Sequence, residues 1–249
     1  MTVGAGSSGG EGGGGGFVTS GLVFHYDVGD TSSYSGTGGT INDLSGNGNH
    51  GTLSGTYNSA GTSSYISSPA ISSPGLANYA GEAGANWSFT HSGWYKFNSF
   101  PNGTDALREF INTDTGGNPK NFIIGFWETG TSSSVHRGSL RLNVGTRFGY
   151  LEAVKYNFNN LVTSSTWFNI AFTADASDKV ILYINGVEEA STNSNGIELG
   201  NGSLTTDVTI NSSRAYSWLN FAQSAYYSTV LSASEITQNF DALKSRYGY

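Results

Sequence analysis

The sequence has 249 residues, of which 36 are glycine and 12% are charged, well below the ~25% charged fraction of an average soluble protein. This length allows one large β domain with a sizeable hydrophobic core. The net charge of -7 argues against nucleic acid as a partner, because a phosphate-binding surface needs clustered Lys and Arg. The absence of cysteine excludes disulfides and thiolate metal sites.

The first sixteen residues form a glycine-rich arm, which we separate from a domain spanning 17–249. Residues 4–16 contain nine glycines, and the composition changes at Phe17. The arm has no basic start and no apolar run of the ~7–15 residues that a secretory signal needs. No later segment reaches the ~18 apolar residues of a membrane span. We therefore expect a soluble protein, made in a cytoplasm without a secretion signal and not inserted into a membrane.

From Gly21 onward, short apolar or alternating runs recur between clusters of Gly, Ser, Thr and Asn, a pattern typical of a β-sandwich or barrel. We predict strands near 21–27, 41–43, 64–67, 87–98, 106–113, 121–128, 139–144, 147–156, 166–174, 179–190, 205–211 and 217–228.

The run 87–98 shows how such a strand faces the core. Trp87, Phe89, Tyr95 and Phe97 share one parity, and smaller or polar residues share the other. Trp94 breaks this pattern, so we expect it to face a second layer of the structure.

Two local patterns are sharper. Asn185-Gly186 separates two strand-like runs, and both residues tolerate the positive φ of a type I′ hairpin turn. Near the C-terminus, Ser232 and Glu235 fit a capping box, which begins a helix that we expect to end at Gly248. Helical spacing places an apolar stripe on one face of this helix, namely Ile236, Phe240, Leu243 and Tyr247.

Several motifs together resemble the laminin-G-like, concanavalin A-like jelly-roll family. They are GLVFHYD, DLSGNGNHGTL, SGWYKF, TWFNIAFTAD, VILYINGVE and YYSTVLSASEITQNFDALKSRYG, which span roughly residues 21–249. The resemblance implies an all-β, two-sheet antiparallel sandwich with one C-terminal helix. It also implies binding modules for carbohydrate or protein, many of them in phage virion and bacterial surface proteins.

The loop DLSGNGNHGTL, residues 43–53, was tested as a calcium site. An EF-hand loop that began at Asp43 would need a bidentate carboxylate at its twelfth position, where the chain has Ser54. A calcium site shared between Asp43 and Asp27 or Asp30 stays open. The favoured interpretation is structural: Asp43 and the asparagines bond nearby backbone groups, while Gly46, Gly48 and Gly51 supply positive φ. We therefore predict no metal and no cofactor.

The sequence also predicts no enzyme. Glycoside hydrolases need paired carboxyl groups, and Glu188 and Glu189 are adjacent, so they point to opposite faces of a strand. The four histidines lack metal-ligand spacing: His25, His50, His91 and His136.

Aromatic side chains make up 13% of the chain and keep a glycan-binding site open. Alternation along strands would bury about half of them. The candidates for sugar stacking are Tyr150, Tyr156, Tyr216, Trp218, Tyr226 and Tyr227, and none stands out.

The arm bears on the choice among function classes. Fixing the backbone of ~15 residues costs about 15–30 kcal/mol of conformational entropy. Backbone hydrogen bonds to a neighbouring subunit would offset this cost. A loose tail is the alternative. If the arm docks, its partner-binding residues are Gly12, Gly13, Gly14, Gly15, Gly16 and Phe17.

These features together predict a non-enzymatic phage virion structural protein, released by lysis. Our leading interpretation is a capsid decoration (cement) protein that binds the major capsid protein through its arm. Two alternatives stay open: a tail or head fibre component, and a carbohydrate-binding, lectin-like module. Self-association is open in each case.

Overall fold

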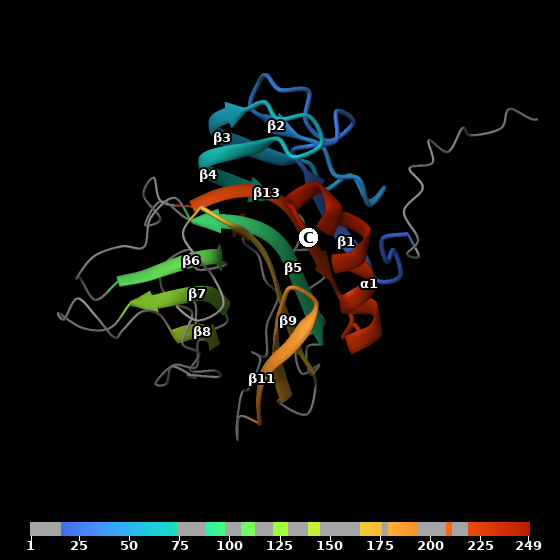
Figure 1. Cartoon of the computed structure of the whole chain (residues 1–249), viewed down its shortest axis with the longest axis vertical. Coiled ribbons are helices and arrows are strands. Elements are labelled where there is room, and N and C mark those ends of the chain that lie inside the picture. Colours follow the sequence, from blue (N-terminus) through green and yellow to red (C-terminus); the bar gives the residue numbers. More distant parts are fainter. Residues whose placement is uncertain are drawn as a thin grey trace, which may run out of the picture.

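The structure is a computed structural model of the chain, and it describes residues 16–73, 88–97, 106–112, 122–128, 139–144, 165–175, 179–193, 208–210 and 219–249. These residues form an all-β, antiparallel jelly-roll sandwich with one C-terminal α-helix, as predicted (Figure 1). The strands are β1 (Leu22–Asp27), β2 (Thr40–Ile41), β3 (Gly51–Asn58), β4 (Tyr65–Ser73), β5 (Phe89–Phe97), β6 (Ala106–Asn112), β7 (Phe122–Glu128), β8 (Ser139–Val144), β9 (Trp167–Ala174), β10 (Lys179–Ile184), β11 (Val187–Asn193), β12 (Val208–Ile210) and β13 (Leu219–Tyr227).

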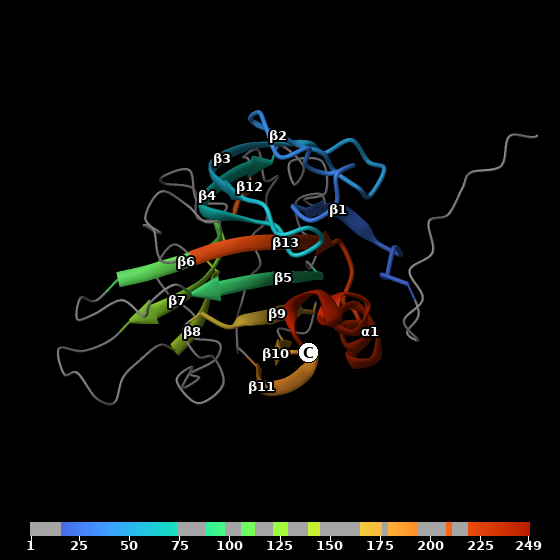
Figure 2. The same ribbon diagram turned by 45° about the horizontal axis from the view of Figure 1, so that its top comes forward.

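The strand order is β11-β10-β9-β5-β13-β4-β12-β6-β7-β8, and β13 connects its two halves. One edge of β13 pairs with β5 along the whole strand. The other edge pairs with β4 at Asn220 and Phe221 and with β1 from Gln223 onward. The register against β5 shifts between Phe221 and Gln223, which places a bulge at Ala222 where the partner changes. Figure 2 shows β1, β13, β5 and β9 as neighbours in this order.

Both faces of β5 are buried, because the C-terminal helix forms a second layer. Directly opposed residues of antiparallel strands share a face, so Trp94 lies on the same face as Gln223 and Asn169. On that face the Trp94 ring stacks on Phe240 at 5.5 Å and on Tyr247 at 4.3 Å between ring centroids. The prediction that Trp94 faces a second layer is confirmed, whereas Trp87 lies outside the described residues.

The helix α1 (Ala233–Leu243) begins as the sequence predicts. Ser232 Oγ accepts from the Glu235 backbone N–H, and the Glu235 carboxylate accepts from the Ser232 N–H, which completes the capping box. A 3₁₀ turn (Lys244–Tyr247) continues the helix, and Gly248 ends it with φ of 91°. Its apolar stripe is buried against the sheet, namely Ile236, Phe240, Leu243 and Tyr247.

The hairpin between β10 and β11 is confirmed, with φ of 52° at Asn185 and 79° at Gly186. A Cβ at Gly186 would lie 3.1 Å from Phe240 atoms, so the glycine also lets the turn approach α1. Thr237 Oγ1 of α1 donates to the Gly186 carbonyl at 3.0 Å. The helix is therefore held from two sides, by β5 and by this turn.

One strand was missed, and β2 and β4 differ in extent from the predicted strands. β3 was read as part of a loop, because GTLSGTYN is polar and most of its described side chains are exposed or half-buried. Gly51 was expected to have positive φ, but it lies in β3, where a Cβ would be 3.0 Å from both Ile41 and Ile71. β2 is shorter than the predicted strand 41–43, and β4 is longer than the predicted strand 64–67. The ends of the strand predicted at 205–211 and the whole strand predicted at 147–156 lie outside the described residues. In the part of the chain that the structure describes, no helix combines the length and apolarity needed to cross a membrane.

We expect Phe240→Ala to lower the free energy of unfolding by about 3–5 kcal/mol, because the ring is 9% exposed and stacks on Trp94. Urea unfolding followed by tryptophan fluorescence measures the effect. Val187→Ala is the control, because Val187 lies beside the same turn but is 60% exposed. Equal unfolding midpoints for the two variants would show that α1 is peripheral to stability.

Candidate functional site

Asp43 organises the loop 42–50 by accepting four hydrogen bonds. Its Oδ1 accepts from the backbone N–H groups of His25 (2.9 Å) and Ser45 (2.8 Å). Its Oδ2 accepts from the Ser45 hydroxyl (2.6 Å) and the Asn49 N–H (3.0 Å). Gly46 and Gly48 have positive φ in this loop. A carboxylate occupied in this way ties the loop to β1 and has little capacity left for a cation.

Asp27 forms a bidentate ion pair with Arg246 of the 3₁₀ turn, with both N–O distances at 2.7 Å. The Asp27 side chain is 4% exposed and that of Arg246 is 17% exposed. Arg246 Nε also donates to the Thr62 carbonyl at 2.7 Å. The pair thus joins β1, the loop after β3 and the C-terminus. Among the described residues, no three His, Asp or Glu side chains gather as a metal site.

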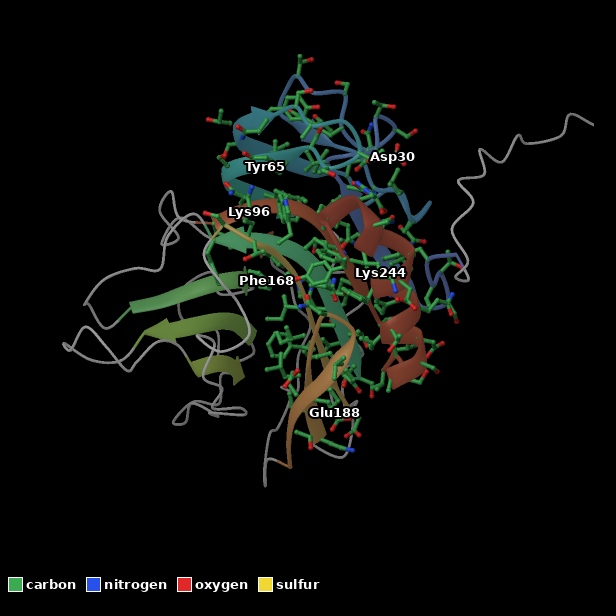
Figure 3. All side chains as sticks on the ribbon, viewed as in Figure 1. Asp30, Tyr65, Lys96, Phe168, Glu188 and Lys244 are labelled. Carbon is green, nitrogen blue, oxygen red and sulfur yellow. The ribbon has the colours of Figure 1, made fainter. Side chains whose placement is uncertain are left out.

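The sugar-stacking candidates, and the titratable groups that the sequence analysis weighed and rejected as catalytic, are scattered. His91 is fully buried beside the Tyr95 hydroxyl at 3.2 Å, and this burial lowers the pKa of His91 to about 3. Glu188 is exposed near the hairpin turn on β11 (Figure 3). Tyr226 and Tyr227 are interior, so neither offers a surface to a sugar. Five more of these residues lie outside the described part of the chain: His136, Tyr150, Tyr156, Tyr216 and Trp218.

The end of the arm rests on the chain's own fold. The Phe17 ring stacks on His25 at 4.4 Å between centroids, with the planes 7° apart. This contact covers His25, and burial lowers the pKa of His25. The Gln238 side chain of α1 donates to the Gly16 carbonyl. The remaining predicted partner-binding residues lie outside the described part: Gly12, Gly13, Gly14 and Gly15.

The structure brings together one group that the sequence reasoning missed, formed by Tyr65, Lys96 and Trp167. We call it the aromatic corner. Lys96 Nζ lies 4.5 Å from the Tyr65 ring centroid and 4.8 Å from the Trp167 centroid. The two rings meet edge to face, with centroids 5.5 Å apart and planes at 72°. All three side chains are half-buried, and Figure 3 labels Tyr65 on β4 and Lys96 on β5, the two strands that flank β13.

Strand register assembles this corner. Lys96 of β5 is directly opposite Trp167 of β9 on one side and Asn220 of β13 on the other. Asn220 is in turn opposite Ser67 of β4, and Tyr65 lies two residues further along β4 on the same face. The face is the one that α1 covers, because Lys96 shares the parity of Trp94. The corner therefore lies at the margin of the helix-covered face.

The C-terminus fixes the Trp167 side of the corner. The Tyr249 hydroxyl donates to the Trp167 carbonyl at 2.7 Å and accepts from Asn185 Nδ2 at 3.2 Å. The Tyr247 ring lies 5.2 Å from the Trp167 ring. These contacts hold one wall of the corner before any ligand arrives, which lowers the entropy cost of binding.

The chemistry of the corner suits a ligand with one apolar face and several oxygens. Aromatic rings offer flat surfaces, and the ammonium group has three donors and no acceptor. Partial burial lowers the pKa of Lys96, and cation-π contacts with the two rings oppose that loss of hydration. The sequence places Lys96 on the same face of its strand as Trp94. No local pattern indicated that Tyr65 and Trp167 lie beside Lys96.

No protein-family model and no curated protein matches the sequence. Solved structures do match. The binding domain of botulinum neurotoxin serotype D/C shares 14% identity with a TM-score of 0.64, over 90% of this chain and 53% of that chain. A structure of botulinum neurotoxin type C, described as depending on two ganglioside molecules to enter cells, shares 14% identity with a TM-score of 0.61, over 90% and 52%. A Trypanosoma rangeli sialidase mutant that displays trans-sialidase activity shares 16% identity with a TM-score of 0.59, over 93% and 34%.

At these identities the likeness establishes the fold alone. The chain spans about half the length of the toxin binding domains that it matches. The sandwich implied by the sequence resemblance agrees with these structures, and a specific relation to laminin G or phage proteins stays a prediction.

We expect calcium chelation to leave the melting temperature unchanged, because the Asp27 and Asp43 carboxylates are occupied by protein donors. Differential scanning calorimetry with EDTA, and then with excess calcium, measures this. A fall of several degrees that calcium reverses would contradict the expectation, since a ligand of the native state raises its stability.

Proposed function

We propose that this chain is a carbohydrate-binding, lectin-like module and that the aromatic corner contacts the sugar. The observation that carries the proposal is the pair of half-buried rings, Tyr65 and Trp167, at 72° around a lysine ammonium. A pyranose presents C–H groups that pack on an aromatic ring and hydroxyl oxygens that accept hydrogen bonds. Ligand sites in proteins commonly combine aromatic walls with a few placed polar groups in this way.

The fold comparisons support this proposal over capsid decoration. The structures described above are toxin binding domains and a sialidase, and one is named for its dependence on gangliosides, which are glycolipids. They favour the alternative that the sequence left open, a lectin-like module, and a role in binding without catalysis. The buried position of His91 fits that role, because this group cannot reach a substrate on the surface.

Glycan binding is tested by array screening followed by isothermal titration calorimetry with the best ligand. We expect Tyr65→Ala and Trp167→Ala each to weaken binding by at least about tenfold, or about 1.4 kcal/mol, through loss of a stacking surface. Trp167→Phe keeps a ring beside Tyr247 and should lose less.

Tyr57→Ala is the matched control. Tyr57 is also a half-buried tyrosine, but it is opposite Ile66 on the β3–β4 pair and therefore lies on the other face from Tyr65. Binding that survives both corner variants, or that Tyr57→Ala reduces equally, would place the sugar elsewhere.

A virion role stays a prediction, and one observation keeps it testable. Phe17 and Gly16 are attached to His25 and α1, so any arm docked on a neighbouring protein would start from a fixed point on the domain. Deleting residues 1–15 should leave the melting temperature unchanged, because Phe17 and Val18 remain. If the arm docks, the deletion should abolish co-sedimentation with phage capsids stripped of decoration. Equal co-sedimentation of the two forms would remove the arm from the interface, and failure of both would remove the capsid.

A further inference from the structure

We propose that the sugar bound at the aromatic corner is anionic, with its acidic group bonded to the ammonium of Lys96. This inference rests on the proposed function and specifies its ligand class. The shared chemistry is an anionic sugar residue, whether its charge comes from a carboxylate or from a sulfate ester.

The first support is that Lys96 lacks a carboxylate partner among the described residues, unlike two other cations of the described part of the chain. Arg246 is paired with Asp27, and Lys244 is paired with Asp241 at 2.7 Å. Lys96 contacts two aromatic rings instead. Burial lowers the pKa of Lys96, and no acidic side chain of the described residues raises it.

The second support is the environment of the ammonium. Tyr65 and Trp167 exclude water from two sides of Nζ, which lies 4.5 and 4.8 Å from their ring centroids. Charge pairs gain strength as the local dielectric constant falls below that of water. An acidic group that reaches Lys96 would therefore bind more strongly than at a fully hydrated lysine.

The third support is selectivity against other anions. Lysine is a compact point charge without the planar fork that arginine offers to free carboxylate or phosphate. A small anion alone would meet a single ammonium and the long-range repulsion of a chain with net charge -7. An anionic sugar adds the apolar contact of its ring with Tyr65 or Trp167, so charge and stacking must act together.

Isothermal titration calorimetry compares four trisaccharides or disaccharides: 3′-sialyllactose, a glucuronate-terminated lactose, 3′-sulfolactose and lactose. We expect wild-type protein to bind at least one anionic sugar about tenfold more tightly than lactose, and sodium chloride to reduce that preference. Comparison of the two carboxylate sugars with the sulfated sugar shows which acidic group supplies the charge. Lys96→Met should lower the affinity for the anionic sugar far more than that for lactose, and Lys96→Arg should keep part of the preference.

Lys244→Met is the matched control, because Lys244 also lies over an aromatic ring, that of Phe240 at 5.8 Å, but is paired with Asp241. It should leave the preference unchanged. Equal affinity of the wild type for lactose and for all three anionic sugars would overturn this inference and leave the carbohydrate-binding function standing. No binding to any of the four, together with an empty glycan array, would overturn both.

Discussion

The burial of Trp94 is the constraint on which the rest of the molecule depends. Its parity on β5 directs the indole away from the inter-sheet core, onto a face that would otherwise meet water. The C-terminal helix covers this face through Phe240 and Tyr247, and the hairpin glycine Gly186 makes room for Phe240. A jelly roll that needed only its two sheets would carry polar residues here. Because this one carries tryptophan, its C-terminus is part of the core.

The same helix lies next to the aromatic corner. Among the described residues, α1 and the Phe17 segment pack on the sheet, and the Asp27–Arg246 pair ties β1 to the C-terminus. The corner lies at the margin of this helix-covered face, where Lys96 of β5 and Trp167 of β9 are directly opposed. Tyr247 contacts both Trp94 and Trp167, so the stacking that anchors the helix also fixes one wall of the aromatic corner.

Local patterns predicted local structure well. The capping box at Ser232, the turn at Asn185-Gly186 and the outward parity of Trp94 each depend on residues a few positions apart, and each is confirmed. β3 was not predicted, because its described side chains beyond Leu53 are exposed or half-buried. This part of the sequence therefore lacks the alternation of apolar and polar residues that indicates a strand. The aromatic corner escaped for another reason: its members come from three strands, and only the registers of β5 with β9 and of β13 with β4 bring them together.

Fold likeness therefore has a limited part in assigning the function. Toxin binding domains and a sialidase share the sandwich at 14–16% identity, so the scaffold is compatible with several activities. Within the described residues, Asp27, Asp43 and His91 are occupied by the chain itself or enclosed in its interior. Lys96 differs from them, because its charge is half-buried, opposed by no carboxylate there, and held between two rings at the margin of the covered face. The two rings offset part of the hydration that this ammonium loses, and the anionic sugar that we propose would add a charged partner.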